Sequence, residues 1–222
     1  MPQDIDEALL TRVRETYARA RSEQAIKALK RNGFEAAYAA TPEEAVQKVL
    51  ELIPEGASVG VGGTMTVRQL GLLSALTGKG HKVVHHWLPD LSPADGRRLR
   101  LEENASDAYL ASANAVTLDG KLVNVDGTGN RVGGMLYGPK KVIIIAGYNK
   151  VVADFDQAID RIRDIAAPMN AIRYASKTPC AATGVCNDCS SPERICNVTT
   201  VIDRCPKSAD FTVLLVGAEL GF

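Results

Sequence analysis

The stretch KKVIIIAGYNKVV, residues 140–152, contains the strongest candidate for a buried strand in the chain. Residues 142–146 are all apolar, and a continuous apolar run of this length is typical of a strand that is covered on both faces. The polar sequence AGYNK, residues 146–150, follows it directly. Loops at the carboxyl ends of parallel strands bind ligands in open α/β sheets, so Lys150 is a candidate catalytic residue.

Short apolar runs and amphipathic helices alternate on both sides of this stretch. Strands are expected within residues 34–40, 57–61, 81–87 and 210–220, and helices over about 5–30, from 42, from about 92 and over 154–169. Thr41 is placed to cap the second helix, with Pro42 at its first position and Glu44 three residues after the cap. This alternation of helix and strand predicts an α/β fold with a parallel sheet.

Composition limits the classes of partner. Lys plus Arg equals Asp plus Glu at 26 each in the 222 residues, so no basic surface of the size that nucleic acid or an anionic membrane needs is expected. The N-terminus lacks the pattern of a signal peptide, and no apolar run reaches the roughly 20 residues that cross a bilayer. We therefore expect a cytoplasmic protein, with one domain over 1–222, a helical segment at 1–31 and a cysteine-rich insertion at 178–207.

A glycine-rich turn lies between an expected strand and helix, in VGVGGTMTVRQLG, residues 59–71. Backbone N–H groups and hydroxyls brought together before a helix accept an anion such as phosphate or carboxylate. The sequence does not match the dinucleotide motif G-x-G-x-x-G, whose third glycine would fall at Met65. The alternative is a tight turn that binds nothing. The candidate ligand-binding residues are Gly60, Gly62, Gly63, Thr64 and Thr66.

A second polar cluster spans residues 112–142 and includes Asp119-Gly120, a dipeptide typical of a tight hairpin turn. Its glycines let a backbone approach a ligand, and the planar guanidinium of Arg131 suits a phosphate or carboxylate. Asp126 and Asp107 are candidate acids or bases. The alternative is that the Asn and Asp side chains cap turns. The candidate ligand-binding residues here are Asn114, Thr117, Asn124, Gly127, Gly129, Asn130 and Arg131.

The five cysteines have the spacing C-x5-C-x2-C-x6-C-x8-C, from Cys180 through Cys186, Cys189 and Cys196 to Cys205. A C-x2-C pair is the commonest unit of thiolate metal sites. The other spacings match neither zinc fingers nor the bacterial ferredoxin pattern, so the metal stays open. Cys205, which is set off before Pro206, is the cysteine expected to be free or a substitute ligand. Disulfides or a redox pair, and unligated thiols, remain alternatives, although a reducing compartment disfavours a disulfide.

The segments SVGVGGTMTVRQLGLLSAL (58–76) and ASANAVTLDGKLVNVDGTGNRVGGMLYGPKKVIIIAGYNKVV (111–152) resemble the lactate-utilisation LUD domain family, which includes LutC-type proteins. The resemblance covers roughly residues 20–175. It implies the fold of the NagB/RpiA/CoA-transferase-like superfamily, a Rossmann-like, mostly parallel sheet with helices on both faces. It also implies iron–sulfur partner proteins, and it places an iron–sulfur cluster slightly ahead of zinc as the cofactor of the cysteines.

The leading hypothesis is a protein of lactate or organic-acid utilisation that binds a small anionic metabolite and carries a thiolate site. One alternative is a phosphosugar- or nucleotide-acting enzyme of the isomerase or ligase type. The chain has no counterpart of the CoA-transferase nucleophilic Glu motif or of the paired acids of the isomerases. Another alternative is a non-catalytic electron-transfer or regulatory subunit. Homo-oligomerisation is compatible with each hypothesis.

Overall fold

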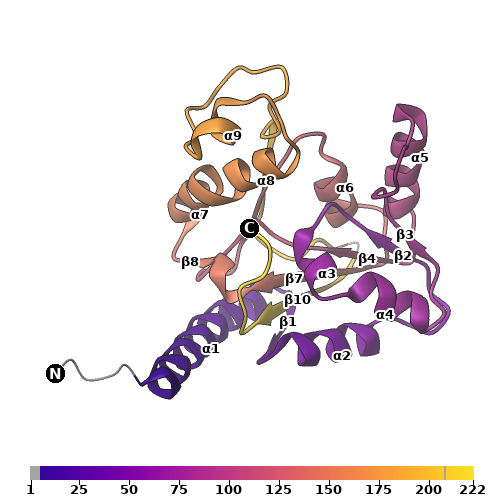
Figure 1. The fold of residues 1–222 in the computed structure, drawn as a ribbon. Coiled ribbons are helices and arrows are strands. Elements are labelled where there is room, and N and C mark those ends of the chain that lie inside the picture. Colours follow the sequence, from indigo (N-terminus) through magenta and orange to yellow (C-terminus); the bar gives the residue numbers. More distant parts are fainter. Residues whose placement is uncertain (1–5, 208) are drawn as a thin grey trace.

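A computed structural model describes residues 6–207 and 209–222, and its centre is a parallel six-stranded sheet (Figure 1). The strand order is β1-β10-β7-β4-β2-β3, and every neighbouring pair is parallel. The strands are β1 (Glu35–Ala39), β10 (Asp210–Val216), β7 (Lys141–Gly147), β4 (Ala108–Ala111), β2 (Val59–Val61) and β3 (Val83–Val84). The structure thus confirms the Rossmann-like α/β fold, and the apolar run at 142–146 lies near the middle of the sheet.

Both faces of this sheet are covered because its central strands carry apolar side chains on each side. On β7, Val142 and Ile144 belong to one core cluster and Ile143 and Ile145 to the other. The first cluster is completed by α1 (Glu7–Arg31) and α6 (Asn130–Leu136). The second is completed by α2 (Pro42–Leu52), α3 (Met65–Gln69) and α4 (Leu72–Gly78). Successive side chains of a strand point to opposite faces of the sheet, so each set of helices packs against alternate residues of β7.

A second sheet of four strands, in the order β8-β5-β6-β9, lies beside the first. Its strands are β8 (Val151–Val152), β5 (Ala115–Thr117), β6 (Leu122–Asp126) and β9 (Val198–Ile202). β5 and β6 form the hairpin expected at Asp119-Gly120, where Gly120 has a φ of 86°. β9 pairs antiparallel with β6, and Val198 lies opposite Asp126. The cysteine-rich segment 178–207 therefore contributes a strand that the sequence reasoning did not expect.

Most local predictions about helix ends are confirmed, whereas one strand is shorter than expected. Thr41 caps α2 by accepting from the Glu44 N–H, and Ser92 caps α5 (Pro93–Asn104). The strand expected over 81–87 covers only Val83–Val84, so the histidines that follow it lie in a loop.

The helix expected over 154–169 is longer than predicted and changes its hydrogen-bonding pattern along its length. It begins as α7 (Phe155–Arg161), passes through a π-helical turn, η2 (Ile162–Ala166), and continues as α8 (Ala167–Arg173). Pro168 has no backbone N–H to donate to the preceding turn, which fits a local change from α- to π-helical bonding. The last turn of α8 thereby reaches the ends of the main-sheet strands.

Two short helical segments complete the described structure, namely the 3₁₀ turn η1 (Tyr148–Lys150) after β7 and α9 (Pro179–Thr183) in the cysteine segment. Within residues 6–207 and 209–222, no helix is both long enough and apolar enough to cross a membrane.

Candidate ligand cavity

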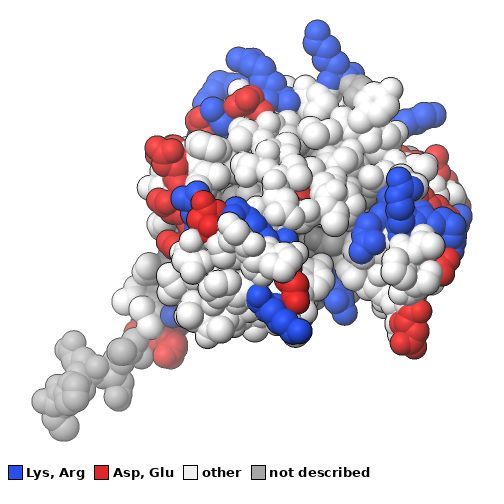
Figure 2. Space-filling model, turned by 90° about the horizontal axis from the view of Figure 1, so that it is seen from above, with Lys and Arg blue, Asp and Glu red and all other residues white. Residues whose placement is uncertain are grey.

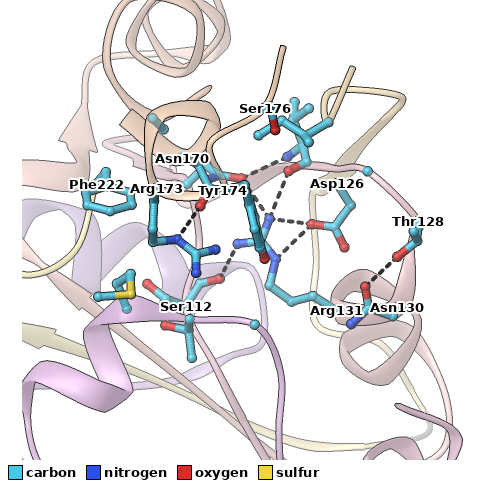
Figure 3. Close-up of a pocket in the computed structure, with 18 of the residues that line it drawn as sticks. Ser112, Asp126, Thr128, Asn130, Arg131, Asn170, Arg173, Tyr174, Ser176 and Phe222 are labelled. Atoms are coloured by element: carbon cyan, nitrogen blue, oxygen red, sulfur yellow. Dashed lines mark hydrogen bonds and ion pairs between the residues drawn. The ribbon is translucent and has the colours of Figure 1, made fainter. Parts of the chain in front are cut away.

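A cavity of about 420 Å³ lies at the carboxyl ends of the main-sheet strands and is called the ligand cavity here. Its walls include residues that follow β2, β4 and β7, namely Thr64, Ser112 and Lys150. The β6–α6 loop closes one side and the last turn of α8 another, as Figure 3 shows. Parallel strands deliver the loops after them to one edge, so residues far apart in the sequence meet there.

Lys150 is the most deeply buried cation of the cavity wall, with 3% of its surface exposed. Its Nζ donates to Ser112 Oγ at 3.0 Å and to Thr66 Oγ1 at 3.1 Å. Burial, and then the nearby Arg161 and Arg131 guanidinium groups, hold the pKa of Lys150 well below 10.5. A lysine in such surroundings can bind an anion as a cation or act as a neutral amine.

Arg131 lines the cavity, but most of its guanidinium N–H groups donate to other groups of the protein. Its Nε and Nη2 donate to Asp126 Oδ1 at 2.9 and 2.6 Å, and Nη1 donates to the Ser112 carbonyl at 3.0 Å. Nη2 also donates to Asn114 Oδ1 at 2.8 Å and to a backbone carbonyl. These bonds leave at most one Nη1 N–H for a ligand, since a guanidinium has five N–H groups. The predicted phosphate or carboxylate contact of Arg131 would therefore be a minor part of its bonding.

The same contacts restrict Asp126. Its Oδ1 accepts from Arg131, and its Oδ2 accepts from the Val132 backbone N–H at 3.1 Å. Figure 3 shows the two side chains facing each other from the end of β6 and the start of α6. A carboxylate whose two oxygens are both engaged in this way orients a loop, and its predicted role as an acid or base would require these bonds to break.

His86 and Glu103 form a buried pair that the sequence reasoning missed. His86 Nδ1 lies 2.7 Å from Glu103 Oε1, and the glutamate side chain is 1% exposed. His86 lines the cavity, and its Nε2 lies near Gly63. A carboxylate that holds one imidazole nitrogen leaves the other to exchange protons, which is the arrangement of a general base. Only the fold brings His86 beside Glu103, because the two residues lie 17 positions apart in the sequence.

Two more arginines line the cavity from helices, Arg100 on α5 and Arg173 on α8. Arg173 Nε donates to Asn170 Oδ1 at 2.9 Å, and its guanidinium lies 3.9 Å from the centre of the Tyr174 ring. In the part of the chain that the structure describes, neither arginine has an acidic partner within 4.0 Å. The lining acids are Asp126, which is paired with Arg131, and Glu193, so positive charge is in excess.

Outside the cavity the charges are mixed. On the face seen from above in Figure 2, basic and acidic side chains alternate around a broad uncharged area. This face therefore has no continuous basic patch of the kind that would bind a nucleic-acid backbone. The excess of positive charge is a property of the cavity rather than of this surface.

The structure brings about half of the predicted ligand-binding and catalytic residues to the cavity. Those that line it are Gly63, Thr64, Asn114, Asp126, Gly127, Asn130, Arg131 and Lys150. The Thr64 hydroxyl is buried and has no hydrogen-bond partner among the described residues, so it is available to a ligand. Sequence reasoning did not name Ser112, Arg100, Arg173, Asn170, Tyr174 or Phe222, which also line it.

The other predicted residues of the glycine-rich turn serve packing. A Cβ on Gly60 would lie 2.0 Å from the Glu103 carbonyl oxygen, and one on Gly62 would lie 2.3 Å from the Tyr109 hydroxyl. These glycines therefore allow β2 to approach its neighbours closely. Thr66 is buried beneath the cavity and acts through its bond to Lys150. The helix that follows, α3, has five residues, so its dipole adds little to anion binding.

Four further predicted residues do not line the cavity. Asp107 precedes β4 at the opposite edge of the sheet, where its Oδ2 accepts from the N–H and hydroxyl of Ser58. Hydrogen bonds to Ser58 hold the pKa of Asp107 below its usual value. Thr117 bonds within the β5–β6 turn, Asn124 Oδ1 accepts from the Asn114 N–H, and Gly129 is the left-handed residue before α6. Thr117 and Gly129 therefore have turn roles, whereas Asp107 and Asn124 bond to other segments of the chain.

The cysteines divide into a group of four and a single residue. Cys180, Cys186, Cys189 and Cys196 line one small cavity between α8 and the loop after α9. Cys205 lies elsewhere, where its N–H donates to the Asn32 carbonyl at the end of α1. All five are free thiols. As the side chains stand, no three His, Cys, Asp or Glu residues within the described ranges are placed to hold a single metal ion.

Comparison with known proteins agrees with the fold. A sequence profile of the LUD domain matches residues 22–216 and so includes the cysteine segment, beyond the resemblance seen up to about residue 175. The crystal structure of a DUF162 family protein from Deinococcus radiodurans is 12% identical, with a TM-score of 0.50 over 91% of this chain and 98% of that chain. A search of curated proteins gives no match. The family profile matches most of this chain, and the chain therefore belongs to the LUD domain family.

Proposed function

We propose that this protein binds a small carboxylate-bearing metabolite, a 2-hydroxy or 2-oxo acid of lactate utilisation, in the ligand cavity. One observation carries the proposal, namely that the cavity is lined by more cationic than acidic side chains. Lys150 lies in one wall, and Arg100 and Arg173 reach the cavity from α5 and α8. A carboxylate would supply the missing negative charge and accept charge-assisted hydrogen bonds from these groups.

The size and the polar groups of the cavity favour a small acid over a nucleotide. Its volume, about 420 Å³, is at the small end of the usual range for ligand pockets. The free Thr64 hydroxyl can bond a hydroxyl or carbonyl oxygen of the ligand. The short α3 and the absence of a G-x-G-x-x-G sequence do not favour a dinucleotide. The family's association with lactate utilisation supports an organic acid.

The His86–Glu103 pair favours a second candidate function, proton transfer on the bound acid. His86 contacts Glu103 through Nδ1, so its Nε2 is the nitrogen that is able to take a proton from a ligand. This function would make the protein a catalyst in its own right rather than a binding subunit. It predicts exchange of a ligand C–H with deuterium in heavy water, which a binding subunit would not catalyse.

Calorimetric titration with lactate, pyruvate and the neutral analogue lactamide tests the leading proposal. We expect the two acids to bind and lactamide to bind at least about tenfold more weakly, because it lacks the charge that the arginines recognise. Arg173→Gln should weaken lactate binding by about 10- to 100-fold, as a charge-assisted hydrogen bond contributes about 1.5–3 kcal/mol. Arg163→Gln is the matched control, since Arg163 is exposed in the same helical stretch and does not line the cavity.

The affinities for lactate and lactamide, and those of the two arginine variants, decide the proposal. Equal affinity for lactate and lactamide would show that charge is not recognised, and the proposal would then be wrong. The same conclusion would follow if Arg173→Gln and Arg163→Gln bound lactate equally well. Weaker binding in Arg173→Gln alone would support the cavity as the binding site.

A further inference from the structure

The four cysteines of the group described above come from a segment with little regular structure of its own. Cys180 lies in the five-residue α9, and the next three lie in the loop between α9 and β9. α9 has no buried residue, and every residue from 179 to 197 is exposed or partly exposed. Apolar burial therefore does little to hold this segment in place, and another interaction is needed to order it.

The backbone of the segment is bent so that four cysteines line one small cavity. Gly184 and Asp188 both have positive φ, at 73° and 49°, and they lie on either side of Cys186. A non-glycine residue in this conformation is uncommon and persists where the surrounding structure requires it. The two bends and the C-x2-C spacing together return the chain to one small cavity, which all four thiols line. Two residues between cysteines let both sulfurs reach one centre.

Arg194 ties the two ends of the loop together at this cavity. Its Nη1 donates to the Cys189 carbonyl at 2.6 Å, its Nε donates to the Cys196 carbonyl at 3.0 Å, and its Nη2 lies 2.8 Å from Asp188 Oδ1. The guanidinium thus fixes the backbone of two cysteines and places a positive charge beside the thiols.

We infer that Cys180, Cys186, Cys189 and Cys196 bind one metal centre through four thiolates, and that Cys205 is not a ligand. Four thiolates hold either a tetrahedral zinc ion or an iron–sulfur cluster. No three donors of the described residues are placed to hold one ion, so the thiol side chains would have to reorient around the centre when it binds. Binding energy of this kind would supply the ordering that the segment lacks in apolar contacts.

Because the thiol cavity adjoins the ligand cavity, the identity of the metal decides how the site would affect a bound ligand. Ile195 lines both the thiol cavity and the ligand cavity, and the neighbouring residues Ala166 and Ala167 line one each. An iron–sulfur cluster here would lie one side chain away from the ligand cavity and would supply one-electron redox chemistry beside it. Zinc, which has no redox chemistry, would instead brace the wall of the ligand cavity. The thiolate site does not depend on the proposed ligand, so the two proposals can fail separately.

The test is elemental analysis, acid-labile sulfide and a visible spectrum of the full chain, purified without oxygen. We expect one equivalent of zinc, or iron with matching sulfide and broad thiolate-to-iron absorption. Cys189→Ser should lose most of the bound metal, and Cys205→Ser, the matched control, should keep it. Iron and zinc would each support the four-thiolate site and decide its chemistry.

A second measurement covers the case in which Cys189→Ser does not fold. Wild-type protein stripped by a chelator is titrated with Co²⁺, which gives intense visible bands when bound by four thiolates, and its thiols are then counted with a chromogenic reagent. The loaded wild type should leave one reactive thiol, and loaded Cys205→Ser should leave none. Wild type that binds neither iron, zinc nor Co²⁺ would overturn the inference, as would metal loss in Cys205→Ser equal to that in Cys189→Ser.

Discussion

Replacing Asp126 by Asn should destabilise the protein strongly, because this change leaves the buried Arg131 without its counter-charge. The two residues are 7% and 8% exposed, and Arg131 gives Asp126 two hydrogen bonds. An asparagine keeps one accepting oxygen, but its amide cannot accept the Val132 N–H that now bonds Oδ2 at 3.1 Å. An unsatisfied buried donor costs about 1–3 kcal/mol, and the full loss of one partner from a buried pair costs about 3–5 kcal/mol.

Urea unfolding followed by circular dichroism measures this loss. With a slope of about 3 kcal/mol per molar urea, a loss of 3–5 kcal/mol lowers the unfolding midpoint by about 1–2 M. Asp107→Asn is the control, because the exposed Asp107 carboxylate bonds only Ser58 at the far edge of the sheet and should matter much less. Adding Arg131→Met to Asp126→Asn should recover part of the loss, since the unpaired buried charge is then removed.

Two results would refute this reasoning. The first is Asp126→Asn unfolding within about 1 kcal/mol of the wild type, which would mean that the pair contributes little to stability. The second is equal destabilisation by Asp126→Asn and Asp107→Asn. Either result would mean that the buried pair does not stabilise the fold in the way that its contacts suggest.

Further predictions concern Lys150 and Gly62. Because burial lowers the pKa of Lys150 below 10.5, the unfolded chain binds more protons between the two pKa values, so wild-type stability should rise with pH toward 10.5. Lys150→Met should lack this rise, and its stability relative to wild type should fall as pH increases; parallel curves in thermal unfolding would contradict this. An anion bound at Lys150 should raise its pKa, so at pH values between the free and the bound pKa lactate binding should take up protons, and its calorimetric enthalpy should there vary with buffer in wild type but not in Lys150→Met. Gly62→Ala should cost about 1–3 kcal/mol in chemical unfolding because its Cβ would meet the buried Tyr109 hydroxyl, whereas Gly63→Ala, with its nearest atom at 3.8 Å, should cost less than half as much.

Secondary structure followed largely from local sequence because its signals are local. The run at 142–146, the cap at Thr41 and the hairpin at Asp119-Gly120 each depend on neighbouring residues, and each is confirmed. The strand expected over 81–87 was too long because only Val83–Val84 finds a partner in the sheet. Strand pairing is a tertiary property, so periodicity alone could not limit that strand.

For the candidate site, the sequence determined which loops would meet, and only the tertiary structure decided what their side chains do. The rule that ligands bind after parallel strands was enough to select Lys150 and the glycine-rich turn. It could not show that Arg131 is occupied by Asp126, that His86 meets Glu103, or that α8 brings Arg173 to the cavity.

The cysteines show the same division. Their spacing predicted thiolate ligands, whereas the separation of Cys205 from the other four depends on where β9 pairs. Local sequence patterns reflect the bonds that neighbouring residues make with each other. Contacts between distant residues depend on how the helices and sheets pack, and they decide charge pairing, burial and hence the chemistry of the site.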